Sequence, residues 1–96
     1  MSPLKKKKLN KIRHELDRLD NSLIKLIKKR TNLVKKVLAL KDKKSQIIDQ
    51  KRIKKILKDI RKKSLMNNID PKITSRIWRN MIWSYIDFEK RNFKKK

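Results

Sequence analysis

The chain has 96 residues, a formal net charge of +23, no cysteine, no glycine and two prolines. This length suits one domain with a small core of its own, and the lack of cysteine excludes disulfides and thiol chemistry. No apolar run approaches the roughly 20 residues that a membrane span requires, and the basic start leads into an amphipathic helix rather than a signal-peptide hydrophobic region. We therefore expect a soluble, cytoplasmic protein.

The first part of the chain predicts a basic N-terminal arm over residues 1–8 and one long helix over residues 9–41. At about 1.5 Å per residue this helix is roughly 50 Å long, whereas a compact chain of this size is only about 30–35 Å across. We therefore expect a second copy to cover its apolar face in an intertwined homodimer. Apolar residues recur on that face at steps of three and four: Leu9, Ile12, Leu16, Leu19, Leu23, Leu26, Leu33, Val37 and Leu40.

Arg30 interrupts this apolar face, because it stands where the pattern places a leucine. A guanidinium in an apolar seam needs an anion to offset the free energy lost on leaving water. Lys41 follows eleven residues later, and about three helical turns return it to nearly the same side of the helix. We expect both cations to converge on one anion. Lys41 also ends a second line of residues that should face the chain's own later helices: Asp20, Ile24, Ile27, Val34, Leu38 and Lys41.

A polar segment, residues 42–46, predicts the first loop, and the next apolar pattern predicts a second helix over residues 47–64. Asp49 and Arg52 lie one turn apart near its start. From the spacing alone, they are an exposed ion pair that contributes about 0.2–0.5 kcal/mol. The apolar face of this helix comprises Ile53, Ile56, Leu57 and Ile60.

Residues 65–69 predict a second loop, and a third helix is predicted over residues 70–92. Asp70 and Pro71 mark its start, because an aspartate can cap a helix N-terminus and proline suits the first helical position. Glu89 is a polar exception in line with core positions. The predicted buried face is Ile73, Ile77, Met81, Tyr85 and Glu89, flanked by Trp78, Ile82 and Phe88.

The three helices predict an all-α fold in a single domain over residues 1–96. Inward-facing Arg, Lys and Glu suggest a cationic pocket, while the sequence holds no Ser-His or Cys-His arrangement and no Gly-rich phosphate loop. The lone histidine, His14, has no metal-ligand partners at suitable spacing, so we predict no metal site.

The charge of +23 also raises a nucleic-acid hypothesis. Most of it is lysine scattered around helix faces and concentrated at residues 5–8 and 94–96, without a helix-turn-helix, zinc or aromatic-platform pattern. We therefore rank compositional drift above a dedicated nucleic-acid site and keep a basic helical nucleic-acid-binding module as an alternative. In either case the positive field would attract a small anionic substrate.

Several short motifs follow one another along the chain: Ile12-Arg13, Leu19-Asp20, Leu26 through Arg30, Lys41, Ile48-Asp49 with Arg52, Ile77-Trp78, Met81-Ile82 and Glu89. Their order and spacing resemble the all-α, type II chorismate mutase family, over nearly the whole chain. This resemblance implies an isomerase that rearranges chorismate to prephenate in the biosynthesis of phenylalanine and tyrosine, without a cofactor.

The resemblance also implies roles for individual residues. Arg30 and Arg52 match arginines that bind the substrate's carboxylates, and Lys41 matches a lysine that reaches the ether oxygen and a carboxylate. Asp49 matches a residue at the substrate hydroxyl. Glu89 matches a position, usually Gln and in some members Glu, that donates a hydrogen bond to the ether oxygen. Lys41, Glu89 and Arg30 are therefore the candidate catalytic residues.

Arg13 matches an arginine that the other subunit supplies. Helix geometry agrees with this role, because Arg13 lies seventeen residues before Arg30 and therefore roughly 25 Å from it. We expect it to act in trans.

This sequence departs from the family pattern at three points. Ile53 stands where many relatives have an acid that helps to bind the hydroxyl. Tyr85 stands where a serine often contacts a carboxylate, and it is kept as a candidate substrate-binding residue, whereas the adjacent Ser84 is not. The loop from Lys41 to Asp49 is one residue short.

One other enzymatic function stays open, beside the nucleic-acid-binding module. An isochorismate pyruvate-lyase has a similar fold and pocket and is the nearest alternative. A purely structural coiled-coil dimer is disfavoured, because Arg30 and Glu89 both stand in line with apolar positions.

Overall fold

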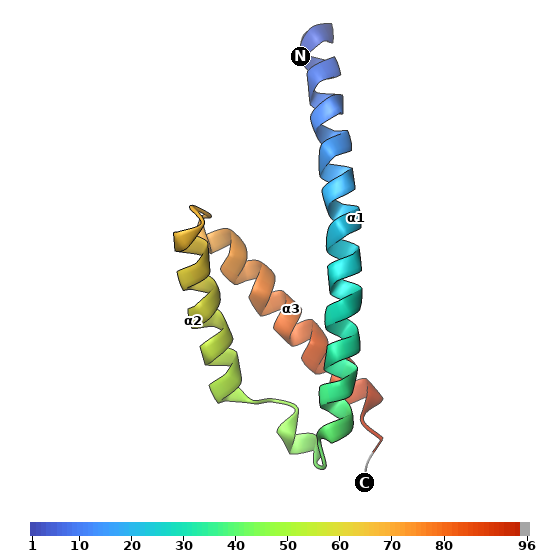
Figure 1. Cartoon of the computed structure of the whole chain (residues 1–96), viewed down its shortest axis with the longest axis vertical. Coiled ribbons are helices and arrows are strands. Elements are labelled where there is room, and N and C mark those ends of the chain that lie inside the picture. The colour runs from blue at the N-terminus through green and yellow to red at the C-terminus, as the bar shows by residue number, and fades with distance from the viewer. Residues whose placement is uncertain (95–96) are drawn as a thin grey trace. The chain divides into compact units, whose positions relative to one another are not determined.

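The computed structural model describes residues 1–94, and this part of the chain is all-α, as the sequence predicts. It contains α1 (Pro3–Leu40), the short 3-10 helix η1 (Lys44–Gln46), α2 (Gln50–Met66) and α3 (Pro71–Asn92), without a strand among these residues (Figure 1). None of the described helices has both the length and the apolar character needed to cross a membrane. The chain divides into two compact units, residues 1–33 and the part from Val34 onward, and α1 contributes to both.

The first unit is the N-terminal part of α1, which begins at Pro3 instead of Leu9. The basic arm predicted over residues 1–8 is therefore wrong. The hydroxyl of Ser2 accepts a hydrogen bond from the backbone N–H of Lys5 at 3.2 Å, and Pro3 occupies the first helical position. This is a favourable helix start, because serine satisfies a free N–H group and proline has no N–H to satisfy.

The apolar face of the first unit is exposed in the single chain. Its side chains have between about half and two thirds of their surface in contact with solvent, so the chain itself does not cover them. The exposed fractions are 54% for Ile12, 53% for Leu16, 61% for Leu19, 54% for Leu23 and 58% for Leu26. The homodimer that would cover this face stays a prediction.

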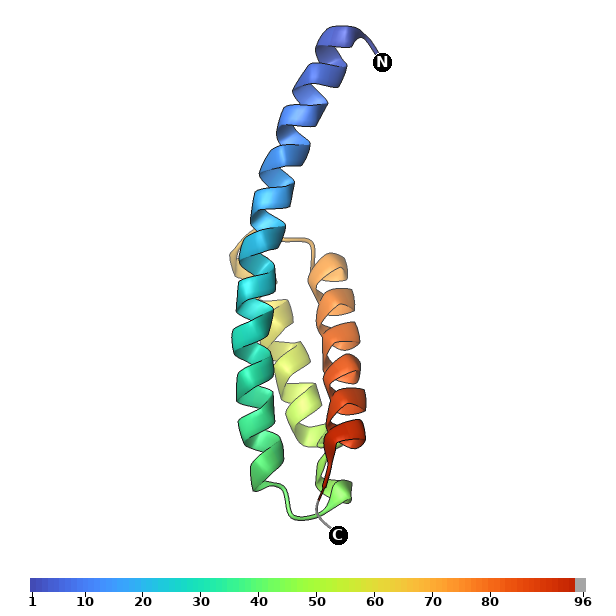
Figure 2. The same ribbon diagram turned by 90° about the vertical axis from the view of Figure 1, so that its right-hand side faces the viewer.

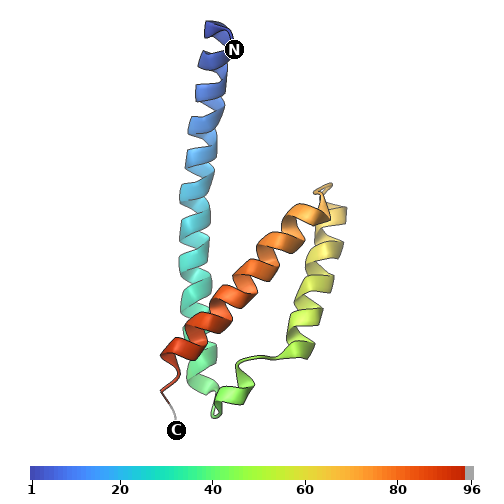
Figure 3. The same cartoon turned by 180° about the vertical axis from the view of Figure 1, so that it is seen from behind.

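The second unit contains the last turns of α1, η1, α2 and α3. The helices α2 and α3 run in opposite directions and are joined by a tight loop (Figures 2 and 3). Asn68 closes α2 with a positive φ of 57°, a left-handed conformation that asparagine tolerates. The N–H groups of Asn68 and Ile69 return to the carbonyls of Leu65 and Ser64 at 3.3 and 2.9 Å. These paired bonds satisfy the last turn of α2 and reverse the chain.

The starts of α2 and α3 both carry an aspartate cap. Asp70 accepts a hydrogen bond from the backbone N–H of Lys72 at 2.9 Å, which confirms the predicted start of α3. Asp49 accepts one from the N–H of Arg52 at 3.0 Å, so α2 begins at Gln50 rather than at residue 47. The helix then continues two residues beyond its predicted end, to Met66. The polar segment 42–46 is partly helical, because η1 forms within it.

The core of the second unit is small. Ile47, Ile82 and Ile86 are buried, and Ile47, which was predicted to lie in a helix, instead lies in the segment between η1 and α2. Ser64 of α2 and Thr74 of α3 add a hydroxyl–hydroxyl hydrogen bond at 2.6 Å. The half-buried residues around this core are Leu38, Ile48, Ile53, Ile56, Leu57 and Phe93.

The buried face of α3 is rotated from the predicted one. Ile82, Ile86 and Glu89 are buried, whereas Ile73 and Ile77 are 56% and 53% exposed. The line through Ile82 and Ile86 packs on the core around Ile47, and residues three or four apart share one side of a helix. Ile73 and Ile77 therefore belong to a face that the chain leaves uncovered.

Candidate active site

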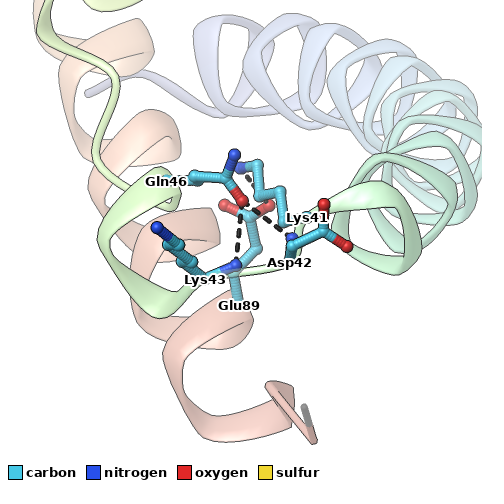
Figure 4. Close-up of polar contacts among 5 residues, drawn as sticks. All are labelled: Lys41, Asp42, Lys43, Gln46 and Glu89. Carbon is cyan, nitrogen blue, oxygen red and sulfur yellow. Dashed lines mark hydrogen bonds and ion pairs between the residues drawn. The ribbon is translucent and has the colours of Figure 1, made fainter. Parts of the chain in front are cut away.

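The candidate catalytic residues Lys41 and Glu89 meet in an ion pair within the second unit. Lys41 directly follows α1 and Glu89 lies near the end of α3, and the lysine Nζ is 2.8 Å from the glutamate Oε1 (Figure 4). The glutamate residue is only 6% exposed and the lysine side chain 18%. Lys41, which follows α1, and Glu89, the polar exception in the apolar pattern of α3, thus lie at one place.

The Glu89 carboxylate needs a positively charged partner, because it is buried near the C-terminal end of α3. A carboxylate in the last turns of a helix faces the negative end of the helix dipole, and a buried charge without a partner is strongly destabilising. The Lys41 ammonium offsets both effects. A lysine ammonium has three N–H donors, so it can bond Glu89 and still donate to a second acceptor. The pair therefore supplies a partly buried cation and an adjacent carboxyl group.

A tight turn after α1 holds Lys41 at this position. The Oε1 atom of Gln46 accepts hydrogen bonds from the backbone N–H groups of Asp42 and Lys43, at 2.7 and 2.9 Å (Figure 4). The N–H of Lys41 bonds the carbonyl of Leu38 at 3.1 Å. The Gln46 side chain thus ties the start of the loop to η1. Sequence reasoning missed this residue, since only the folded turn brings the amide to those N–H groups.

Asp49 and Arg52 lie at the start of α2 and are both exposed. Their contact is the cap described above, from the Arg52 backbone N–H to the Asp49 Oδ1, and not the ion pair that their spacing suggested. Within residues 1–94, neither residue is hydrogen-bonded or ion-paired to Lys41 or Glu89. Their approach to a substrate at that pair stays a prediction.

The remaining site candidates fall in different parts of the chain. Tyr85 is half-buried and lies one turn before Glu89 on α3, while the hydroxyl of the exposed Ser84 bonds the carbonyl of Asn80 at 2.7 Å within the helix. Ile53, which replaces an acid of the family pattern, packs against the core. Arg13 is exposed and Arg30 half-buried, and both belong to the first unit. Their roles stay predictions.

Among the described residues, no three His, Asp or Glu side chains gather in a way that could hold a metal ion. The predictions that the protein needs no metal and no cofactor stay untested.

Comparison with known proteins identifies the family. A family model described as chorismate mutase type II matches residues 12–90. Searches of curated proteins and of solved structures found no match. The matched segment covers most of the chain, includes every candidate site residue named above and contains the Lys41–Glu89 pair. The chain therefore belongs to the type II chorismate mutase family.

Proposed function

We propose that this protein is a chorismate mutase, an isomerase that converts chorismate to prephenate in the biosynthesis of phenylalanine and tyrosine. The observation that carries the proposal is the buried ion pair between Lys41 and Glu89, together with the family match. The rearrangement breaks the ether C–O bond of the substrate while a C–C bond forms. No proton, electron or leaving group is exchanged, so the reaction needs no general base and no nucleophile.

The protein's work is to hold the substrate in its compact chair-like conformer and to stabilise the charge that grows on the ether oxygen. Lys41 would donate to that oxygen, and its partial burial strengthens the interaction relative to one in bulk water. Removing one such donor from an active site typically lowers kcat by about 10²–10³-fold.

Glu89 would donate a second hydrogen bond to the ether oxygen, for which its carboxyl group must carry a proton. An ionised carboxylate has only acceptor lone pairs and would oppose the negative charge developing on that oxygen.

Arg13, Arg30 and Arg52 would bind the two carboxylates, because a guanidinium can hold a carboxylate with two parallel hydrogen bonds. Arg13 would come from a second copy of the chain, so that each dimer has two shared sites. The exposed apolar face of the first unit supports this arrangement, since Leu16, Leu19, Leu23 and Leu26 are each more than half exposed in the single chain. Asp49 would contact the substrate hydroxyl, and Tyr85 would lie beside the substrate.

A two-substrate assay tests the proposal against the nearest alternative. The pure protein is mixed with chorismate in one reaction and isochorismate in another, and the products are separated by chromatography. A chorismate mutase consumes chorismate and forms prephenate. Pyruvate release from isochorismate, with chorismate unchanged, would instead assign the pyruvate-lyase activity.

A Lys41→Met variant serves as the control for contaminating enzymes. We expect it to lose at least about 10²-fold in kcat. If its rate equals that of the unmodified protein, the activity does not arise at this pair.

A further inference from the structure

The outward side of α2 carries a straight row of lysines. Lys51, Lys55, Lys58 and Lys62 follow one another at steps of four, three and four, so they lie along one side of the helix. All four are exposed. We call these four residues the lysine row. The opposite side of α2 carries the half-buried residues Ile53, Ile56, Leu57 and Ile60.

The residues that flank the lysine row on the exposed surface of α2 are also positively charged. Lys54 and Arg61 flank the lysine row on one side, and Arg52 and Lys63 flank it on the other. The helix thus carries eight basic residues and a single acidic one, Asp59. Such clustering of cations along one helix is the electrostatic footprint of a polyanion site.

Asp59 cancels only one charge of this surface. Its carboxylate accepts a hydrogen bond from Lys55 at 2.7 Å, and this bond lowers the pKa of Asp59, as do the nearby charges of Lys55, Lys63 and Arg52. Asp59 is therefore ionised at neutral pH and pairs with one member of the lysine row. The other three members have no acidic side chain within ion-pair distance among residues 1–94.

The spacing of the lysine row matches the charge density of nucleic acid. The two ends of the row, Lys51 and Lys62, are eleven residue steps apart and therefore about 16 Å apart along the helix axis. One strand of a duplex presents a phosphate about every 3.4 Å, or about five over that length. Four flexible lysines can thus each reach a separate phosphate.

The chemistry of this surface disfavours other macromolecular partners. Protein interfaces are depleted in lysine and rely on buried aromatic or aliphatic anchors, and the lysine row contains none. A membrane-surface helix needs a free apolar face, whereas the apolar side of α2 packs on the core of the second unit. The row also lacks an aromatic side chain on which a base could stack.

We propose that the lysine row of α2 binds the phosphate backbone of nucleic acid without reading its sequence, as an activity separate from the proposed reaction on chorismate. The sequence has no helix-turn-helix, zinc or aromatic-platform pattern for reading bases, which agrees with backbone binding alone. Binding then has no sequence preference and weakens steeply as salt rises, because each contacted phosphate releases counterions.

Fluorescence anisotropy with a labelled 20-base-pair duplex of arbitrary sequence tests this proposal, over a salt series from 50 to 200 mM. Replacing the lysine row by glutamine (Lys51→Gln, Lys55→Gln, Lys58→Gln and Lys62→Gln) should reduce the slope of log K against log salt by about three to four, at about 0.9 per lost contact. The matched control replaces Lys5, Lys6, Lys7 and Lys8, which removes the same four charges from α1. Its slope should change by less than about one.

A variant that should bind the duplex more tightly provides a second test. Asp59→Asn removes the one acidic residue of α2 and releases Lys55 from its ion pair. Its affinity for the duplex should rise. Circular dichroism at 222 nm checks that every variant keeps its helices, which separates lost binding from lost fold without reference to any turnover of chorismate.

Several outcomes would overturn the proposal. The proposal would be wrong if 100 µM of the unmodified protein failed to saturate the duplex in 50 mM salt. It would also be wrong if the control variant lost as much of the slope of log K against log salt as the lysine-row variant. Equal displacement of the duplex by poly-glutamate and by unlabelled DNA, at equal charge concentration, would assign the surface to acidic polypeptides instead. A change in affinity with base sequence would contradict backbone binding.

Discussion

The two units of this chain carry similar amphipathic helix patterns, but the second unit buries part of its apolar residues, whereas the apolar face of the first unit is exposed. In the second unit, Val34 and Leu38 at the end of α1 are half-buried, and Leu38 packs on the core. In the first unit, Ile24 and Ile27 of the same line are 66% and 46% exposed. This chain thus builds the Lys41–Glu89 pair alone, and the proposed second copy would cover the helix that carries Arg13 and Arg30.

The largest effect is expected from charging the uncovered face of α1. The double variant Leu16→Asp/Leu23→Asp should abolish dimer formation, because two carboxylates would be buried in an apolar seam without partners. Activity should be lost with it, since each proposed site needs Arg13 from the other copy. Light scattering should give a mass near that of one chain, 11.7 kDa.

The control for this variant is His14→Asp/Asn21→Asp, which has the same seven-residue spacing and the same change in charge on the opposite side of the helix. It should stay dimeric and active. A folded, active monomer in either variant would show that the site is complete within one chain.

Breaking the ion pair of the second unit should affect stability and activity together. Lys41→Met leaves the Glu89 carboxylate buried without its partner, which should lower the free energy of unfolding by about 3–5 kcal/mol. Adding Glu89→Gln removes the buried charge and should restore most of the stability but not the activity. Urea denaturation followed by circular dichroism measures the first effect, and chorismate turnover measures the second.

A Lys41→Met variant as stable as the unmodified protein would mean that the carboxylate finds another partner or water. The stability of the buried Glu89 carboxylate would then not depend on Lys41.

Glu89→Gln tests the proposed role of Glu89 as a hydrogen-bond donor to the ether oxygen. The glutamine amide keeps a donor at this position, so the variant should still turn over chorismate. Loss of turnover in a variant that stays folded by circular dichroism would contradict this role.

The smallest effect is expected from the turn that positions Lys41. Gln46→Ala removes the acceptor for two backbone N–H groups and should cost about 0.5–1.5 kcal/mol of stability. It should also lower kcat more than it raises KM, since Lys41 would lose its fixed position rather than its charge. The matched control, Gln50→Ala, changes a glutamine at the first residue of α2. Equal effects of the two changes would exclude a positioning role for Gln46.

The helices could be predicted from the sequence, because apolar spacing and the Asp70-Pro71 start are local signals. Glu89 was noticed from the same patterns as a polar residue in line with core positions, whereas the catalytic roles of Glu89 and Lys41 were implied by the family resemblance. The first helix start was missed although Ser2 and Pro3 signalled it, because the lysines that follow resembled a frayed arm. The start of α2 was misplaced because Asp49 was interpreted as an ion-pair partner instead of a cap.

Other features could not have been derived from local patterns. The role of Gln46 depends on how the chain turns after α1, and the rotation of the buried face of α3 depends on its packing against Ile47. Both are tertiary effects. The spacing of apolar residues in α3 permits either of two neighbouring faces to be buried, and only the packing of α3 on the core of the second unit selects one of them.

The most direct test of the shared chorismate mutase site is complementation between two inactive variants. Arg13→Ala and Arg30→Ala should each lose at least about 3 kcal/mol of transition-state stabilisation, while both stay folded. Mixing the two chains through unfolding and refolding should restore chorismate turnover, because each mixed dimer would contain one site with both arginines intact. No recovered turnover, with mixed dimers confirmed by mass spectrometry, would contradict the shared site.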